Sequence, residues 1–151
     1  MTEQELQTLK ENIENVSMRI ARAAKSAGSD PEQIQLVAAA KMNDAERVKE
    51  AIRCGIRIAG ENRVQELLEK YEQGAYQGAA LHFIGTLQTN KVKYLMGKVS
   101  LIQSVGSEKL GRCIAREAEK NGICQDILLE VNIGGEEAKS GLPVEDLEST
   151  I

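Results

Sequence analysis

Residues 35–44 have the sequence Gln-Leu-Val-Ala-Ala-Ala-Lys-Met-Asn-Asp, an apolar run of strand length that ends in Lys41. Asp44 follows within a few residues and is a favourable residue for the start of a helix. A strand joined to a helix by a short loop is the repeating unit of α/β folds, and the loop follows the carboxyl end of the strand. The stretch therefore predicts a βα unit with a lysine at the exit of its strand.

The same alternation recurs along the chain at intervals of roughly 19 to 25 residues. The pattern predicts strands at about 35–41, 56–59, 81–84, 99–102 and 126–133, and helices at about 44–54, 61–73, 86–96, 107–122 and from 143 onward. Such alternation predicts a parallel sheet, either open and doubly wound or closed as a (β/α)8 barrel. No G-x-G-x-x-G motif follows the first strand, and the units are short and uniform, which favours the TIM-barrel type.

The length of the pattern predicts an incomplete barrel of about five βα units, since a barrel of this type has eight strands. The chain stops at Ile151, inside its last helical pattern. We therefore expect residues 31–151 to be the N-terminal portion of a single β/α barrel domain. An amphipathic helix starting at Thr2 and Glu5 precedes it, so residues 1–30 are expected to pack on the barrel as an added N-terminal helix.

Composition narrows the classes of function. The net charge of −4 argues against a nucleic-acid or anionic-membrane surface, and no apolar run is long enough to span a membrane. Three widely separated cysteines and an acidic, polar N-terminus suggest free thiols in a cytoplasmic protein. One histidine, His82, and the lack of a close cysteine pair argue against a Cys/His zinc site, whereas a carboxylate magnesium site stays open. His82 is expected near the start of its strand, in the core or at the lower face.

Polar residues stand at the end of each predicted strand. These are Lys41, then Glu61 and Asn62, then residues 85–91, then Gln103 and Ser104, and finally Asn132 with the glycine-rich loop 134–141. The carboxyl ends of the strands form one rim in a β/α barrel, and this rim carries the chemistry. We therefore expect a ligand site there.

Lys41 has two interpretations. A lysine at a strand end commonly extends into water. Alternatively, its amine is a nucleophile: a free lysine has a pKa of ~10.4, and desolvation at an apolar barrel mouth would lower that pKa and permit an imine with an aldehyde. Asn62 likewise has two roles open to it, as the cap of the following helix or as a ligand contact.

Several stretches together resemble the pyridoxal phosphate homeostasis proteins, also called proline synthetase co-transcribed homologues. They are Leu36-Val37-Ala38 with Lys41, Gly60-Glu61-Asn62-Arg63-Val64-Gln65-Glu66, residues 82–91, Val131-Asn132-Ile133 and Lys139-Ser140-Gly141. The resemblance implies a barrel similar to the N-terminal domain of alanine racemase. It also implies pyridoxal 5′-phosphate (PLP) held as a Schiff base on Lys41, with Asn62 and Ile84 beside it; Asn132 and Ser140 complete the expected cofactor-binding set.

The chain departs from the family pattern in two respects. Ala40 and Met42 flank the lysine, where the family commonly has serine and threonine. The resemblance also implies that the phosphate cradle and the arginine facing the pyridine nitrogen come from the last strands of the barrel, so no residue here is assigned to either role.

Three functions follow from these residues. The first is a non-catalytic PLP carrier that stores, buffers or delivers the cofactor, with PLP-dependent apo-enzymes as recipients; we expect a monomer at full length and self-association of a fragment through open sheet edges. The second is a PLP-dependent racemase or decarboxylase of the barrel type, which needs an acid/base group beside the cofactor. The third is an aldolase-like imine enzyme, for which Glu61 is the candidate acid/base.

Overall fold

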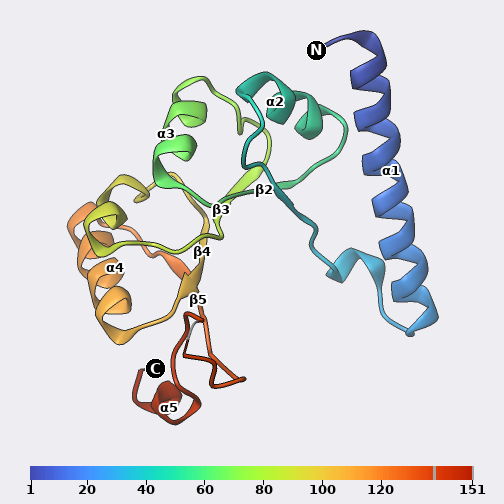
Figure 1. The fold of residues 1–151 in the computed structure, drawn as a ribbon. Helices are drawn as coiled ribbons and strands as arrows, with labels where there is room; N and C mark the ends of the chain where they lie inside the picture. Colours follow the sequence, from blue (N-terminus) through green and yellow to red (C-terminus); the bar gives the residue numbers. More distant parts are fainter. Residues whose placement is uncertain (138, 151) are drawn as a thin grey trace.

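The computed structural model describes residues 1–137 and 139–150 as a set of βα units preceded by one long helix (Figure 1). The strands are β1 (Val37–Ala39), β2 (Ile58–Glu61), β3 (Ala80–Phe83), β4 (Leu101–Val105) and β5 (Asp126–Leu129). The α-helices are α1 (Glu3–Ser26), α2 (Ala45–Arg53), α3 (Val64–Glu72), α4 (Glu108–Asn121) and α5 (Leu147–Thr150). Three 3₁₀ helices join them: η1 (Pro31–Gln33), η2 (Thr89–Tyr94) and η3 (Val144–Asp146). Ala138 and Ile151 lie outside the described residues.

The five strands form one parallel sheet in the order β1-β2-β3-β4-β5, which is the order of the chain. A doubly wound sheet reverses its strand order at a switch point, whereas a barrel adds each strand beside the previous one. The observed order therefore confirms the prediction of a TIM-barrel type of α/β fold. Figure 1 shows the sheet curving, with α2, α3 and α4 on the same side of it.

The hydrophobic core lies between the sheet and these helices. Side chains of a strand alternate between the two faces of a sheet, and the helix-facing set includes Ala59, Leu81, Phe83 and Ile102. They pack with buried side chains of the helical layer, namely Val48, Leu67, Val92, Leu95 and Ile114. Phe83 is fully buried, and burial of one such side chain is worth roughly 1.5–3 kcal/mol.

Several helix ends are fixed locally, as the sequence predicts. Thr2 and Glu5 form a capping box, in which the Thr2 N–H donates to Glu5 Oε2 at 2.7 Å and the Glu5 N–H donates to Thr2 Oγ1 at 3.2 Å. Asp44 accepts from the Arg47 N–H at 2.7 Å, and Ser107 accepts from the Leu110 N–H at 3.2 Å. Because each cap satisfies an orphan donor of the first turn, α1, α2 and α4 begin at the predicted places.

The predicted helix over 86–96 is wrong, because only the 3₁₀ helix η2 forms there. No side-chain hydrogen bond caps its start at Gln88, and Thr89 and Asn90 have low helix propensity. A spacing of three residues lets Val92 and Leu95 both enter the core.

The predicted fifth strand over 126–133 is too long. The chain folds back after Leu129, so that the Asn132 N–H donates to the Leu142 carbonyl at 2.8 Å and the Leu142 N–H donates to the Glu130 carbonyl at 2.7 Å. The isolated bridge between Val131 and Leu142 closes the loop that begins after β5.

The N-terminal helix α1 packs beside α2, with Leu9 and Ile13 lining a groove together with residues of β1 and α2. Only Ala24 of this helix is buried, and Val16 and Met18 are exposed. In Figure 1 it runs along one side of the molecule, away from α4 and α5. No helix within 1–137 or 139–150 has the length and apolar character needed to cross a membrane.

Candidate cofactor site

The carboxyl ends of the strands lie side by side and are joined by backbone contacts. The Ala40 N–H donates to the Gly60 carbonyl at 2.8 Å, and the Ile84 N–H donates to the Glu61 carbonyl at 2.9 Å. Ser104 Oγ donates to the Gly85 carbonyl at 2.5 Å, which joins β4 to the same row. Lys41, Asn62 and Ile84 are thereby placed at three neighbouring strand ends.

Lys41 lies in a tight turn from Ala40 to Asn43, two residues beyond the end of β1. The Asn43 N–H donates to the Ala40 carbonyl at 3.2 Å, and Asn43 Nδ2 donates to the Lys41 carbonyl at 3.1 Å. Met42 has a φ of +63° at the third position, which is typical of a type II turn and disfavoured for a side chain other than glycine or asparagine. The sequence predicts that Lys41 is desolvated at an apolar barrel mouth. In the structure Lys41 is instead exposed, and the described residues do not bury its side chain.

Asn62 and Ile84 lie at the neighbouring ends of β2 and β3. A Cβ at Gly60 would come within 2.8 Å of Ile84 Cδ1, so Ile84 covers a glycine of the neighbouring strand. The cap role for Asn62 is wrong, because α3 begins after Arg63 and no side chain caps it. Asn62 Oδ1 is instead buried without a hydrogen-bond partner in the described parts of the chain. A buried amide oxygen without a partner is unusual and retains unused capacity to accept a hydrogen bond.

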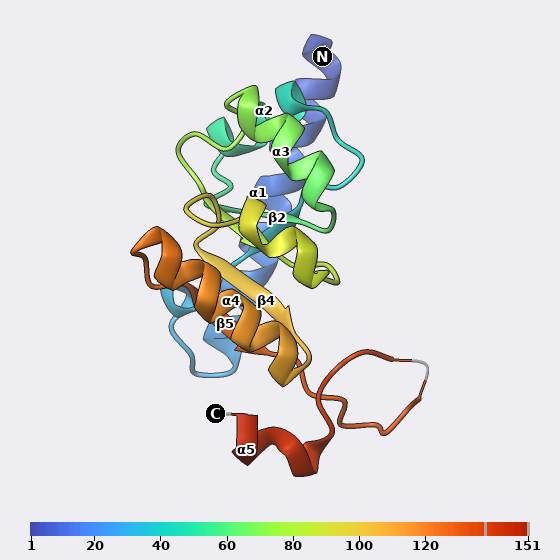
Figure 2. The same cartoon turned by 90° about the vertical axis from the view of Figure 1, so that its left-hand side faces the viewer.

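Asn132 and Ser140 lie together in the loop that follows β5. Asn132 Nδ2 donates to the Glu136 carbonyl at 2.9 Å, and Ser140 Oγ donates to Glu130 Oε1 at 2.7 Å. Both side chains therefore support the loop itself, which extends away from the sheet in Figure 2. The structure thus divides the five predicted residues into one group at β1–β3 and a second group beyond β5.

His82 is buried, as expected for a core histidine, but it occupies the third position of β3 and therefore lies one position further along its strand than predicted. It alternates with Leu81 and Phe83 and therefore lies on the face opposite the helices. Gln103 Nε2 lies 2.9 Å from His82 Nδ1. Burial lowers the pKa of the imidazole, so the neutral ring is favoured and Nδ1 can accept from the amide.

A buried polar cluster behind the rim was not predicted. We use the name Glu61 cluster for Glu61, Glu66, Lys70 and Tyr76. Lys70 Nζ donates to Glu61 Oε1 at 2.8 Å, to Glu66 Oε1 at 2.7 Å and to the Ala40 carbonyl at 2.7 Å. Tyr76 donates its hydroxyl to Glu61 Oε1 at 2.9 Å. The only signal in the sequence is the i,i+4 spacing of Glu66 and Lys70, which is common on exposed helices.

The charges of this cluster shift the pKa values of its members. The hydrogen bond from Lys70 lowers the pKa of Glu66. Burial by itself would lower the pKa of Lys70, but the hydrogen bonds to Glu61 and Glu66 outweigh it, so the net shift is upward. Burial and then the Glu61 charge raise the pKa of Tyr76. Lys70 is therefore a fixed cation and Tyr76 a fixed neutral donor at neutral pH.

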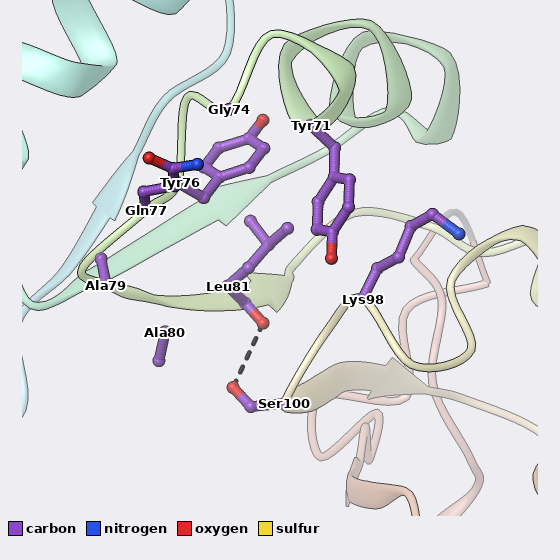
Figure 3. A pocket seen from close by; sticks show the side chains of 9 residues that line it. All are labelled: Tyr71, Gly74, Tyr76, Gln77, Ala79, Ala80, Leu81, Lys98 and Ser100. Carbon is purple, nitrogen blue, oxygen red and sulfur yellow. Dashed lines mark hydrogen bonds between the residues drawn. The ribbon is translucent and has the colours of Figure 1, made fainter.

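A separate pocket lies at the opposite end of the strands and is distinct from this rim (Figure 3). It is lined by residues near the starts of β3 and β4, including Ala80 and Ser100, and by Tyr71 and Lys98. The Lys98 Nζ stands 5.7 Å from the centre of the Tyr71 ring, and Ser100 Oγ donates to the Leu81 carbonyl at 3.2 Å. In β/α barrels the amino-terminal ends of the strands serve stability and the carboxyl ends serve chemistry.

The residues at the ends of β1–β3 fit an aldehyde cofactor with an aromatic ring. They offer an exposed primary amine on Lys41, an unpartnered amide oxygen on Asn62, and the apolar side chain of Ile84 beside two glycines. Within residues 1–137 and 139–150 no group of three or more His, Cys, Asp or Glu side chains has the geometry of a metal site.

Comparison with curated proteins gives a consistent set of relatives, although no protein-family model matches the chain. The "Pyridoxal phosphate homeostasis protein" of Aquifex aeolicus is 47% identical over 138 residues, which are 91% of this chain and 60% of that protein. The protein of the same name from Pseudomonas aeruginosa is 36% identical over 142 residues, 94% of this chain and 62% of that protein. The chain thus spans about three fifths of these relatives.

Solved structures agree with this result. A crystal structure of an unknown protein from Bifidobacterium adolescentis matches with a TM-score of 0.90 at 33% identity. The match covers 99% of this chain and 65% of the chain from Bifidobacterium adolescentis. PipY of Synechococcus elongatus, in a structure with PLP bound, has a TM-score of 0.71 at 30% identity, with 86% of this chain and 60% of PipY covered. The predicted resemblance in sequence and fold is confirmed.

Proposed function

Because this chain is homologous to the pyridoxal phosphate homeostasis proteins over about three fifths of their length, we propose that it binds PLP and takes part in intracellular PLP homeostasis. In this proposal it stores, buffers or delivers the cofactor and turns over no substrate. Support comes from the names of the curated relatives and from the PLP-bound structure of PipY.

The observation that carries the proposal is the position of Lys41. Its amine is exposed on a turn that is held at both ends, beside Asn62 and Ile84 at the adjacent strand ends. The proposed bond forms when Nζ of the neutral amine attacks the aldehyde carbon of PLP and one water molecule leaves, which gives a C=N bond. Asn62 would accept a hydrogen bond from the cofactor, and Ile84 would pack on its ring. Asn132 and Ser140 stay proposed contacts from the loop beyond β5.

The lack of turnover is proposed from the environment of the acid/base candidates near the rim. A racemase or decarboxylase requires a group that moves a proton at the substrate. Glu61 is fully buried and its Oε1 accepts from Lys70 and Tyr76, so it faces α3 rather than the solvent beside Lys41. This arrangement also removes the acid/base of the aldolase-like alternative. The racemase or decarboxylase stays the second candidate, with its acid/base supplied from elsewhere in the complete barrel.

The remaining parts of the proposal concern organisation. We propose that residues 1–30 are an N-terminal helix packed on the barrel and that 31–151 are the N-terminal portion of one barrel domain. PLP-dependent apo-enzymes are the proposed recipients, and the full-length protein is proposed to be a monomer. The free cysteines Cys54, Cys113 and Cys124 suit a cytoplasmic location. A chain restricted to 1–151 would self-associate through its exposed strand β5, where Leu128 is half-exposed.

The test is covalent trapping of the cofactor. Mixing the full-length protein with PLP should produce the visible absorbance of a Schiff base, and borohydride should fix the cofactor to the peptide that contains Lys41. Lys41→Ala should abolish both signals, whereas Lys10→Ala, which removes an exposed lysine of α1, should retain them. An unchanged band in Lys41→Ala would refute the lysine assignment. Amino-acid racemisation or decarboxylation at rates typical of enzymes would refute the carrier and favour the second candidate.

A further inference from the structure

We propose that Glu66 and Lys70 are positioning residues for Lys41, which they serve by holding the two peptide groups on either side of it. This inference rests on the proposed function, since it assumes that the Lys41 amine bonds to PLP. It assigns a role to the buried side of the rim, which neither the motif resemblance nor the relatives' names address.

The contacts are made to the backbone of the turn rather than to the lysine side chain. The carbonyl of Ala40 belongs to the peptide bond before Lys41 and accepts from Lys70 Nζ at 2.7 Å. The N–H of Met42 belongs to the peptide bond after Lys41 and donates to Glu66 Oε1 at 2.7 Å. Because both peptide groups of Lys41 are held, the direction of its Cα–Cβ bond is fixed while the side chain stays free in solvent.

The two holding residues are themselves fixed to α3 and to each other. Lys70 Nζ donates to Glu66 Oε1, so one carboxylate oxygen receives both the ammonium and the Met42 N–H. Lys70 is 5% exposed and is also held by Glu61, whose Oε1 accepts a further bond from Tyr76. A charge buried to this degree is kept only when it is paired. The cluster is therefore a rigid support that connects α3 to the turn.

The backbone of the turn needs such support. Met42 is 93% exposed and has a positive φ that an L side chain rarely adopts. No packing of its own side chain favours this conformation, so the hydrogen bonds of the turn select it, and the bond from the Met42 N–H to Glu66 is the one that joins the turn to α3. Loss of that bond would let the peptide group rotate and would redirect Lys41. Misplacement of a reacting group by about 1 Å can cost up to about 100-fold in reactivity.

The test uses Glu66→Ala, with Glu69→Ala as its matched control. Both variants remove one carboxylate from α3, but Glu69 is exposed and, among the described residues, its carboxylate accepts a hydrogen bond only from Gln65. Two quantities are measured in the full-length protein: hydrogen exchange of the Met42 amide without PLP, and the affinity for PLP from the Schiff-base absorbance. Glu66→Ala should exchange Met42 at least about tenfold faster and bind PLP about tenfold more weakly, while Glu69→Ala should match the wild type.

Glu66→Gln keeps a carbonyl oxygen for the Met42 N–H and should restore most of both quantities, which separates positioning from a general loss of stability. If Glu66→Ala does not fold, Glu66→Met takes its place, because methionine keeps the length of the side chain but has no oxygen to accept from the Met42 N–H. Unchanged Met42 exchange in Glu66→Ala, or faster exchange with unchanged PLP affinity, overturns the inference. Failure of the wild type itself to bond PLP would refute the proposed function, and the Met42 exchange rates would still report whether Glu66 holds the turn.

Discussion

The backbone of Asn62 lies directly against Gly85, so closely that a Cβ on Gly85 would stand 2.1 Å from the Asn62 carbonyl oxygen and 2.7 Å from its Cα. The contact brings the residue after β2 against the residue two positions beyond β3. Neither side of it is a flexible side chain that could move aside. The approach of these two loops therefore requires glycine at position 85.

Gly85→Ala is expected to destabilise the fold by roughly 1–3 kcal/mol or more, since relief of this overlap requires the backbone of Asn62 to move. The measurement is the urea midpoint at unchanged m-value. Gly111→Ala is the matched control. In that position, within α4, a Cβ would meet only Val105 Cγ1 at 3.7 Å, so the control should gain about 0.5–1 kcal/mol of helix stability. A stable Gly85→Ala would show that the two loops are not in contact.

Removal of Lys70 should lower the free energy of unfolding, because Lys70 is the cation paired with the buried carboxylate of Glu61. Lys70→Met leaves Glu61 without its cation while Glu61 Oε2 already lacks a partner in the described residues. We expect a loss of about 3–5 kcal/mol in the free energy of unfolding. The double variant Lys70→Met with Glu61→Leu should recover much of this loss, because no charge then stays buried. Equal stability of the single and double variants would contradict the role of Glu61 as a buried anion.

The limits of prediction from the sequence follow from the range of each interaction. Asp44 and Ser107 act on the turn beside them, and both helix starts were predicted correctly. The second strand was placed at 56–59, two residues before β2, because a pattern of apolar residues does not include Glu61. That carboxylate is buried in the strand because Lys70 and Tyr76 return to it from α3 and the following loop. Such a pairing belongs to tertiary structure and leaves no periodic signal.

In the candidate site, too, some placements could be predicted from the sequence, whereas contacts between distant residues could not. The strand pattern was sufficient to predict that Lys41, Asn62 and Ile84 lie at neighbouring strand ends, because the strand ends of a parallel sheet share one edge. The contacts of Asn132 and Ser140 depend on the chain folding back after Leu129, whereas the sequence predicts that the strand continues for four more residues, to Ile133. The support of the Lys41 turn by Glu66 and Lys70 was not predictable, since it joins residues that are distant in sequence.

His82 should make stability depend on pH just below neutrality. Burial lowers its pKa in the folded protein, so the unfolded chain, with a pKa near ~6.5, binds the proton more readily. The contribution is complete above pH ~6.5 and is lost as the pH falls towards the lowered folded value. Urea titrations at pH 7.5 and 5.5 should show this loss in the wild type and a smaller one in His82→Gln. The chain has one histidine, so a single imidazole NMR titration gives the folded pKa. A value above that of a free imidazole would contradict the burial of an uncharged ring.

Met42 offers the opposite experiment, in which a substitution stabilises the protein. Its φ of +63° costs an L residue roughly 1–2 kcal/mol, and its side chain is almost fully exposed and buries nothing in return. Asparagine tolerates this conformation better and keeps the N–H that donates to Glu66. Met42→Asn should therefore raise the free energy of unfolding by a few tenths to about 1 kcal/mol. Met42→Val, which is β-branched, should lower it by a similar or larger amount. The difference between the two variants measures the strain in the turn directly, and equal stabilities would mean that Met42 does not hold a positive φ in solution.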